Sequence, residues 1–304
     1  MRVAPLKDVV SAPRLATTDS LSVVRDFVSL TKPRLSGLVL FTAAGAMWLS
    51  GRSLPLSTWL FAMLGTAGTV GAANAFNCLM ERDSDRFMAR TSTRPLPAGR
   101  MEPLSALVFA TVLAMTSLPL LAVGVNALTG ALGLLALLSY VLVYTPMKSR
   151  TWWAMVVGAV PGALPPLMGW TAATNAIEVP GLVLFGILFF WQLPHFIAIA
   201  LFRKAEYRAA GLTSLPLEKG DDAARLQAVL YLGALMPMSV LPVVCHVAGL
   251  GYLIVALALG TLFAGTGVQG WLRRGDAAWA RRFFGISLLY LTGLFAALGL
   301  NGGL

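Results

Sequence analysis

The feature that most constrains this chain is a series of long apolar runs separated by short polar segments. Each run is close to the roughly 20 residues that cross a bilayer as a helix. Long alternating strands are absent, which argues against a transmembrane barrel. The break at residues 124–126 is so short that 103–145 could also be one merged segment. Nine runs can be distinguished: 35–52, 57–79, 103–124, 126–145, 152–173, 180–202, 225–244, 247–270 and 283–301.

Composition supports the same fold class. Of the 304 residues, 57% are hydrophobic and only 12% are charged, whereas soluble domains carry roughly 25% charged residues. We therefore predict an all-α polytopic membrane bundle of about nine transmembrane helices over residues 31–304. Residues 1–30 contain neither a spanning run nor a small-residue cleavage site, so we expect a flexible cytoplasmic tail. A transit peptide is the alternative, which Asp8, Asp19 and Asp26 disfavour.

The positive charge of the chain lies almost entirely on one side of the predicted membrane. Of 23 Lys and Arg residues, 22 fall in the tail and in alternate loops, and only Arg52 falls on the opposite side. Positive loops mark the cytoplasmic side, so the N-terminus is predicted inside and the C-terminus outside. The net charge of +10 is thus explained by topology, and no nucleic-acid partner is expected.

Acidic residues share that side, and their pattern is more specific. Twelve of 13 carboxylates are predicted on the inner side, with Glu178 as the exception. At the end of the second run, Asn77, Glu81 and Asp85 are spaced i, i+4, i+8. On a single helix, Asp85 would lie only about 80° around the axis from Asn77 and about 12 Å along it, so the three side chains would share one face. Oxygen ligands at this spacing suit Mg²⁺. The alternative is a solvated helix end, but the like charges of Glu81 and Asp85 would then repel each other.

Basic residues follow this acidic group directly. Arg86, Arg90 and Arg94 precede a loop rich in Pro and Gly, and guanidinium groups are suited to binding a diphosphate. Taken alone, these arginines could simply be topology signals. Beside an acidic group with metal-like spacing, they favour a diphosphate site.

A second polar group lies around the end of the sixth run. Glu206 is a single acid among the bases Arg203, Lys204 and Arg208. His195 lies within the run itself, and an intramembrane histidine is a candidate functional residue. An interhelical hydrogen bond is the alternative explanation.

The fifth run contains Pro161, Pro165 and Pro166 together with three glycines. Prolines and glycines in a helix leave some backbone N–H and C=O groups without their helical hydrogen bonds. Within a membrane, such groups are tolerated only where they are buried in protein or line a cavity. We infer an internal cavity beside this segment, with ordinary kinking as the alternative.

Taken together, these motifs resemble the UbiA superfamily of membrane prenyltransferases, from about residue 28 to residue 225. The first acidic motif of that family matches Asn77, Glu81 and Asp85, with Glu in place of the first Asp. Its second motif would begin at Glu206, but its second acid is replaced by Ala210. This departure points to the haem O synthase branch, which the following segments also resemble: Thr31-Lys32-Pro33-Arg34, Arg90-Thr91, Arg94-Pro95-Leu96, Tyr144-Thr145, Pro161-Gly162, Pro165-Pro166, Gly169-Trp170, Trp191-Gln192, Pro194-His195, Tyr207, Ala210-Gly211 and Leu215-Pro216.

The resemblance implies a reaction: transfer of a farnesyl group from farnesyl diphosphate to a vinyl group of haem B, with water adding, to give haem O. It further implies a bacterial inner-membrane protein, and haem A synthase or oxidase assembly factors as conceivable partners. A UbiA-type enzyme acting on a quinone precursor and a secondary transporter are the alternatives. The implied roles are Mg²⁺ binding by Asn77, Glu81, Asp85 and Glu206, diphosphate binding by Arg86, Arg90, Arg94, Lys148 and Arg150, stabilisation of the allylic cation by Tyr144, and contact with haem by His195.

Overall fold

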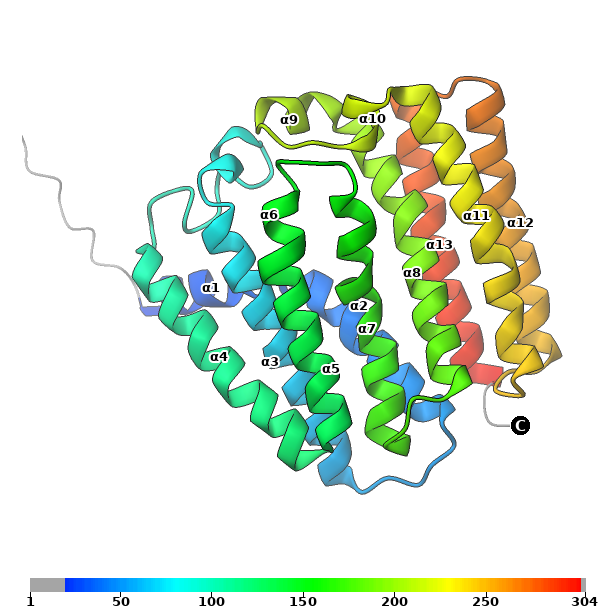
Figure 1. Ribbon diagram of the computed structural model, residues 1–304, viewed down its shortest axis with the longest axis horizontal. Helices are drawn as coiled ribbons and strands as arrows, with labels where there is room; N and C mark the ends of the chain where they lie inside the picture. Colours follow the sequence, from blue (N-terminus) through cyan, green and yellow to red (C-terminus); the bar gives the residue numbers. More distant parts are fainter. Residues whose placement is uncertain (1–19, 302–304) are drawn as a thin grey trace, which may run out of the picture.

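The computed structural model describes residues 20–301, which contain helices and no strand (Figure 1). Eight segments of 21 to 25 residues in this part of the chain are long and apolar enough to cross a membrane. They confirm the predicted all-α membrane fold. The eight are α3 (Leu56–Met80), α4 (Pro103–Gly124), Ala127–Met147, α7 (Ala154–Thr174), α8 (Val179–Phe202), α11 (Asp221–Val244), α12 (Leu250–Leu272) and α13 (Ala277–Asn301).

The first predicted run corresponds to α2 (Pro33–Leu49), which has 17 residues and is the shortest of the nine. Its start is fixed by Pro33, because a residue before proline is driven out of the right-handed helical region. Lys32 lies outside that region, in the left-handed one, with a φ of 50°. At the other end, Gly51 has a φ of 65°, so the helix stops before the predicted limit at residue 52.

The predicted break at residues 124–126 is confirmed. Asn126 adopts extended backbone, and its side chain accepts a hydrogen bond from Thr129 N at 2.8 Å, which caps α5 (Ala127–Leu138). The same span continues through a π-helical turn, η2 (Ser139–Tyr144), into α6 (Thr145–Met147). The segments 103–124 and 126–145 are therefore two helices that turn back on each other.

Residues 20–30, assigned to the tail from sequence, form helix α1 (Ser20–Leu30). Leu30 is buried, the rings of Phe27 and Phe109 lie 5.1 Å apart, and Asp26 receives two 3.0 Å hydrogen bonds from Arg100. These contacts hold α1 against the bundle. Residues 1–19 lie outside the described part of the chain.

Helix α7 is the most buried of the candidate spans, at 72% of its apolar window, and it packs against both α2 and α8. A Cβ at Gly169 would lie 2.0 Å from the Ala43 carbonyl oxygen of α2. Glycine thus allows the two helices to approach closely. The three prolines lie within a continuous helix surrounded by protein, and a cavity beside it stays a prediction.

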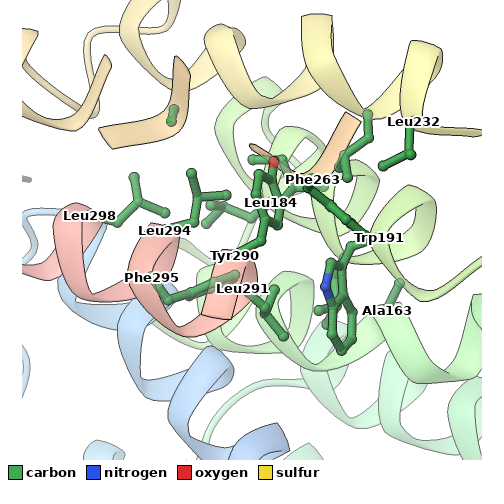
Figure 2. Close-up of a cluster of buried hydrophobic side chains, with 14 of the residues drawn as sticks. Ala163, Leu184, Trp191, Leu232, Phe263, Tyr290, Leu291, Leu294, Phe295 and Leu298 are labelled. Carbon is green, nitrogen blue, oxygen red and sulfur yellow. The ribbon is translucent and has the colours of Figure 1, made fainter. Parts of the chain in front are cut away.

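The C-terminal half forms the largest apolar core, between α8, α11, α12 and α13 (Figure 2). Trp191, Leu232, Phe263 and Tyr290 meet there, one from each of these helices (Figure 2). Buried polar groups pair across the helices, as where Tyr252 donates to the Ser239 carbonyl at 2.8 Å.

The segments that carry the polar motifs meet at one end of the bundle, the upper end in Figure 1. The loop after α3, the turn after α6 and the short helices α9 (Lys204–Ala209) and α10 (Leu215–Glu218) lie at this end. Thr213 N donates to the Lys148 carbonyl at 2.9 Å, and Trp152 N donates to Glu218 at 3.1 Å. The fold therefore gathers motifs that are more than a hundred residues apart.

Candidate active site

The acidic motif begins on α3 but does not continue as one helix, so the single-helix geometry predicted for it was wrong. Helix α3 ends at Met80, and Asp85 lies in a short 3₁₀ turn, η1 (Ser84–Phe87). Two backbone hydrogen bonds nevertheless keep the i, i+4 relation, from Glu81 N to Asn77 O at 2.9 Å and from Asp85 N to Glu81 O at 2.8 Å. The three residues are still stacked in sequence order.

Each residue of the motif is hydrogen-bonded to a different cationic side chain. Asn77 Oδ1 accepts from Lys32 Nζ, Glu81 Oε1 from Lys148 Nζ, and Asp85 Oδ2 from Arg94 Nη1, each at 2.7 Å. The cations come from the start of α2, the end of α6 and the loop after η1. Two carboxylates and one amide are thus matched by three positive groups at the mouth of the bundle.

The charges of Glu81 and Lys148 support each other. Burial by itself raises the pKa of Glu81, but the charge and hydrogen bond of Lys148 outweigh it and hold this pKa below its ordinary value. Burial by itself lowers the pKa of Lys148, yet Tyr144 and Glu81 raise it well above its ordinary value. The pair is therefore ionised on both sides at neutral pH.

Lys32 lies in a different electrostatic environment. Burial lowers its pKa to about 8. Its nearest acceptor is the neutral amide of Asn77. Because an amide compensates a buried ammonium less well than a carboxylate does, Lys32 is the least stabilised cation of the three.

One oxygen of the motif has no partner. Asp85 is 1% exposed, and its Oδ1 makes no hydrogen bond with any described residue. Buried polar atoms are nearly always hydrogen-bonded, so an orphan of this kind calls for an explanation. Together with Asn77 and Glu81, it supplies the oxygen donors that Mg²⁺ prefers.

Tyr144 lies directly beside this group. The Lys148 ammonium lies 4.8 Å from the centre of its ring, and the ring of Tyr140 lies 5.1 Å away. A Cβ at Gly158 would come within 2.4 Å of the Tyr144 ring, so glycine is what lets the ring pack closely against α7. The π-helical turn that ends at Tyr144 belongs to a class often found at functional sites.

The predicted diphosphate-binding residues are not all in one place. Arg94 and Lys148 contact the acids directly. Arg86 is exposed and lies 4.0 Å from Asp83, and Arg90 and Arg150 are exposed on the same end of the bundle.

Glu206 does not join the other acids in this structure. Both of its carboxylate oxygens accept hydrogen bonds from Arg203, at 2.7 and 2.9 Å. Within residues 20–301, no group of three or more His, Cys, Asp or Glu side chains is placed to hold a metal. The helix that carries Glu206, α9, nevertheless lies at the same end of the bundle as the loop after α3 (Figure 1).

His195 lies inside α8, away from the acids, where it is 8% exposed. Its Nδ1 lies 2.7 Å from Ser287 Oγ on α13. The interhelical hydrogen bond considered from sequence is therefore present.

Residues 38–291 match the model of the UbiA prenyltransferase family. The chain belongs to this family. It is 62% identical over 287 residues to a protoheme IX farnesyltransferase of Myxococcus xanthus, and the alignment covers 94% of this chain and 98% of the relative. The relative and this chain therefore align over nearly their whole length.

Two solved structures show the same fold. A digeranylgeranylglyceryl phosphate synthase superposes with a TM-score of 0.79 at 16% identity, covering 91% of this chain and 98% of the other. A UbiA homolog from Archaeoglobus fulgidus bound to GPP and Mg²⁺ superposes with a TM-score of 0.62 at 19% identity, covering 90% and 99%. The UbiA fold is thus confirmed independently of close sequence similarity.

Sequence reasoning missed one residue of this UbiA site. Lys32 was recognised only as part of the Thr-Lys-Pro-Arg segment, with no role. Its contact with Asn77 spans 45 positions, which no local spacing reveals. The available signal was a lysine immediately before a proline that starts a membrane helix.

Proposed function

We propose that this chain transfers a farnesyl group from farnesyl diphosphate to a vinyl group of haem B, with addition of water, to form haem O. The observation that carries the proposal is the stack of Asn77, Glu81 and Asp85, each bound by a cation, at the mouth of a UbiA bundle. The acceptor is assigned from the relative that is 62% identical over nearly the whole chain and is named a protoheme IX farnesyltransferase.

Asn77, Glu81 and Asp85 would hold Mg²⁺. Their fit rests on the donor set and on the buried, unpartnered Oδ1 of Asp85, since Mg²⁺ takes one or two carboxylates and completes its shell with water and phosphate oxygens. A bound Mg²⁺ would supply positive charge for the departing diphosphate. Glu206 would hold a further Mg²⁺ when its hydrogen bonds from Arg203 are broken. The archaeal UbiA homolog bound to GPP and Mg²⁺ supports this use of the fold.

Lys148, Arg94 and Lys32 would bind the diphosphate. Each now donates to a residue of the acidic stack, and each can turn to a phosphate oxygen when a metal takes over its present acceptor. Arg86, Arg90 and Arg150 would add contacts from the exposed rim. Binding of the polyanion is thereby coupled to a rearrangement of charges already in place.

Tyr144 would face the farnesyl carbon that loses the diphosphate. When the carbon–oxygen bond breaks, its electron pair leaves with the diphosphate and positive charge develops on the allylic group. An aromatic ring within about 6 Å stabilises a cation. The vinyl group then donates its electron pair to the allylic carbon, water adds to the cation formed on the haem side chain, and a proton is released.

The membrane topology supports this arrangement. The chain is an integral membrane protein, and we place its site at the cytoplasmic face of a bacterial inner membrane, with the C-terminus outside. The support is the side on which 22 of the 23 Lys and Arg residues lie. Contact with haem A synthase or oxidase assembly factors remains a prediction.

The test is incubation of membranes containing the chain with haem B, farnesyl diphosphate and Mg²⁺, followed by mass analysis of extracted haem. We expect a haem whose mass has increased by one farnesyl group and one hydroxyl group, and no product when EDTA is present. An unchanged haem mass from folded protein would refute the proposal.

A further inference from the structure

The hydrogen bond of His195 fixes which of its nitrogens carries the proton. Ser287 Oγ lies 2.6 Å from the Phe284 carbonyl oxygen and donates its single hydrogen there. It therefore has only lone pairs left for His195, whose Nδ1 lies 2.7 Å away. With the Ser287 hydrogen directed to that carbonyl, Nδ1 is the donor to Ser287 Oγ, and the neutral ring then keeps a lone pair on Nε2.

The orientation of this ring is fixed as well. Trp191 and Phe284 lie over it with ring centres 4.7 Å away in each case. Trp191 is itself held by a 2.7 Å hydrogen bond from its Nε1 to the Ser287 carbonyl. The ring of Phe196 lies 5.8 Å away, inclined at 60°, so three aromatic rings hold the imidazole in place.

Nε2 has no partner within residues 20–301. It makes no hydrogen bond there, and it is not among the fully buried atoms that lack one, which are Asp85 Oδ1 and Ser214 Oγ. Nε2 therefore keeps some accessible surface. An imidazole that donates through one nitrogen to a fixed acceptor and presents the other unprotonated is the usual arrangement of a metal-binding histidine.

Two cations lie beyond the same aromatic group, towards the charged end of the bundle. The ring of Phe202 lies 5.8 Å from that of Phe284, and the guanidinium groups of Arg203 and Arg281 lie 5.4 and 5.9 Å from the Phe202 ring. Arg203 is shared with Glu206, while Arg281 is exposed. A pair of arginines suits a pair of carboxylates.

We propose that the face formed by α8 and α13 binds the porphyrin substrate, with His195 Nε2 as ligand to the iron and Arg203 and Arg281 as partners of the two propionates. Ser287 is a positioning residue that fixes the His195 tautomer. This inference rests on the proposed function, because it takes haem B as the acceptor. It adds where that acceptor lies and which residues distinguish an iron porphyrin from an iron-free one.

The test compares haem B with metal-free protoporphyrin IX, titrated into the full chain in nanodiscs and followed by absorption and resonance Raman spectroscopy. H195A should lose the histidine-ligated iron spectrum and bind haem B about 10- to 100-fold more weakly, with metal-free porphyrin binding unchanged. H246N is the matched control, since His246 is the chain's other histidine and follows α11. It should behave as the unmodified chain does.

S287A keeps the ligand but removes its acceptor, so we expect weaker haem B binding and unchanged binding of the metal-free porphyrin. R203Q/R281Q should weaken both porphyrins but spare haem dimethyl ester, which lacks propionate charges. Retention of the iron spectrum by H195A, or an equal loss of both porphyrins, would overturn the inference. If H195A does not fold, undiminished haem B affinity in S287A overturns it.

These results can be separated from failure of the proposed function. If the unmodified chain forms haem O while H195A keeps the original iron spectrum, only the porphyrin site is refuted. If the unmodified chain neither binds haem B nor forms haem O, the proposed function and the porphyrin site are refuted together.

Discussion

Lys148 Nζ lies 2.7 Å from Glu81 Oε1, although 67 positions separate the two residues. The contact joins the end of α6 to the end of α3, and each residue keeps the other charged. Glu81, which is proposed to hold Mg²⁺, is thus already paired with Lys148, which is proposed to bind the diphosphate. Substrate binding and metal binding should therefore depend on each other.

The first prediction concerns the acidic stack. D85N and E81A should each reduce Mg²⁺-dependent haem O formation by about 10²-fold or more, because each removes a carboxylate proposed to hold the Mg²⁺ that stabilises the departing diphosphate. D83N is the matched control, since Asp83 lies between them in sequence but is 72% exposed. Product analysis of membranes with equal amounts of folded protein measures the effect, and equal activity in D85N and D83N would contradict the metal assignment.

The second prediction separates diphosphate binding from general positive charge. K148Q should lower kcat/KM for farnesyl diphosphate about 10- to 100-fold, the value of one charge-assisted hydrogen bond. K219Q removes an exposed lysine from the same end of the bundle and should leave kcat/KM unchanged. Equal losses in both variants would show that only net surface charge matters.

The third prediction concerns the glycine under Tyr144. G158A should destabilise the protein by about 1–3 kcal/mol and lower activity, because its Cβ would come within 2.4 Å of the Tyr144 ring. G265A, on α12, meets no atom within 4 Å and should be neutral or slightly stabilising. Thermal unfolding in detergent and product formation are the measurements, and an active, stable G158A would contradict the close packing.

The fourth prediction is a pH dependence. The pKa of Glu81 is lowered in the folded chain from an ordinary value of 4.5, so its contribution to stability is complete above pH 4.5 and is lost as the pH falls further. E81Q lacks this contribution. The melting temperatures of the unmodified chain and E81Q should differ at pH 7 and converge below pH 4.5, whereas a constant difference would exclude an ionised, paired Glu81.

The sequence predicted the fold well because length and apolarity determine membrane helices almost directly. Some helix ends were misplaced because the helix continues past the apolar run into polar residues. Helix α13 begins at Ala277, six residues before the predicted run, and Asp276 accepts a hydrogen bond from Trp279 N at 2.9 Å. The end of α3 at Met80 was not visible either, because nothing in Glu81-Arg82-Asp83 breaks a helix by composition.

The site was predictable in its components and not in its pairings. Spacing alone identified Asn77, Glu81 and Asp85. Which basic residue pairs with which residue of the motif depends on tertiary contacts, such as those of Arg94 with Asp85 and of Lys32 with Asn77. Glu206 shows the same limit, since its contact with Arg203 at i−3 competes with any role beside the other acids.

The shortness of α2 bears on the membrane itself. Its 17 residues rise about 26 Å, less than the roughly 30 Å of a typical hydrocarbon core. A span too short for its surroundings draws the two leaflets together or makes flanking side chains reach outward. The lipid beside α2 should therefore be locally compressed, which brings the headgroup layer down towards Lys32. Acyl-chain length in the host bilayer would then tune how readily a long isoprenoid diphosphate passes from the lipid phase into the bundle.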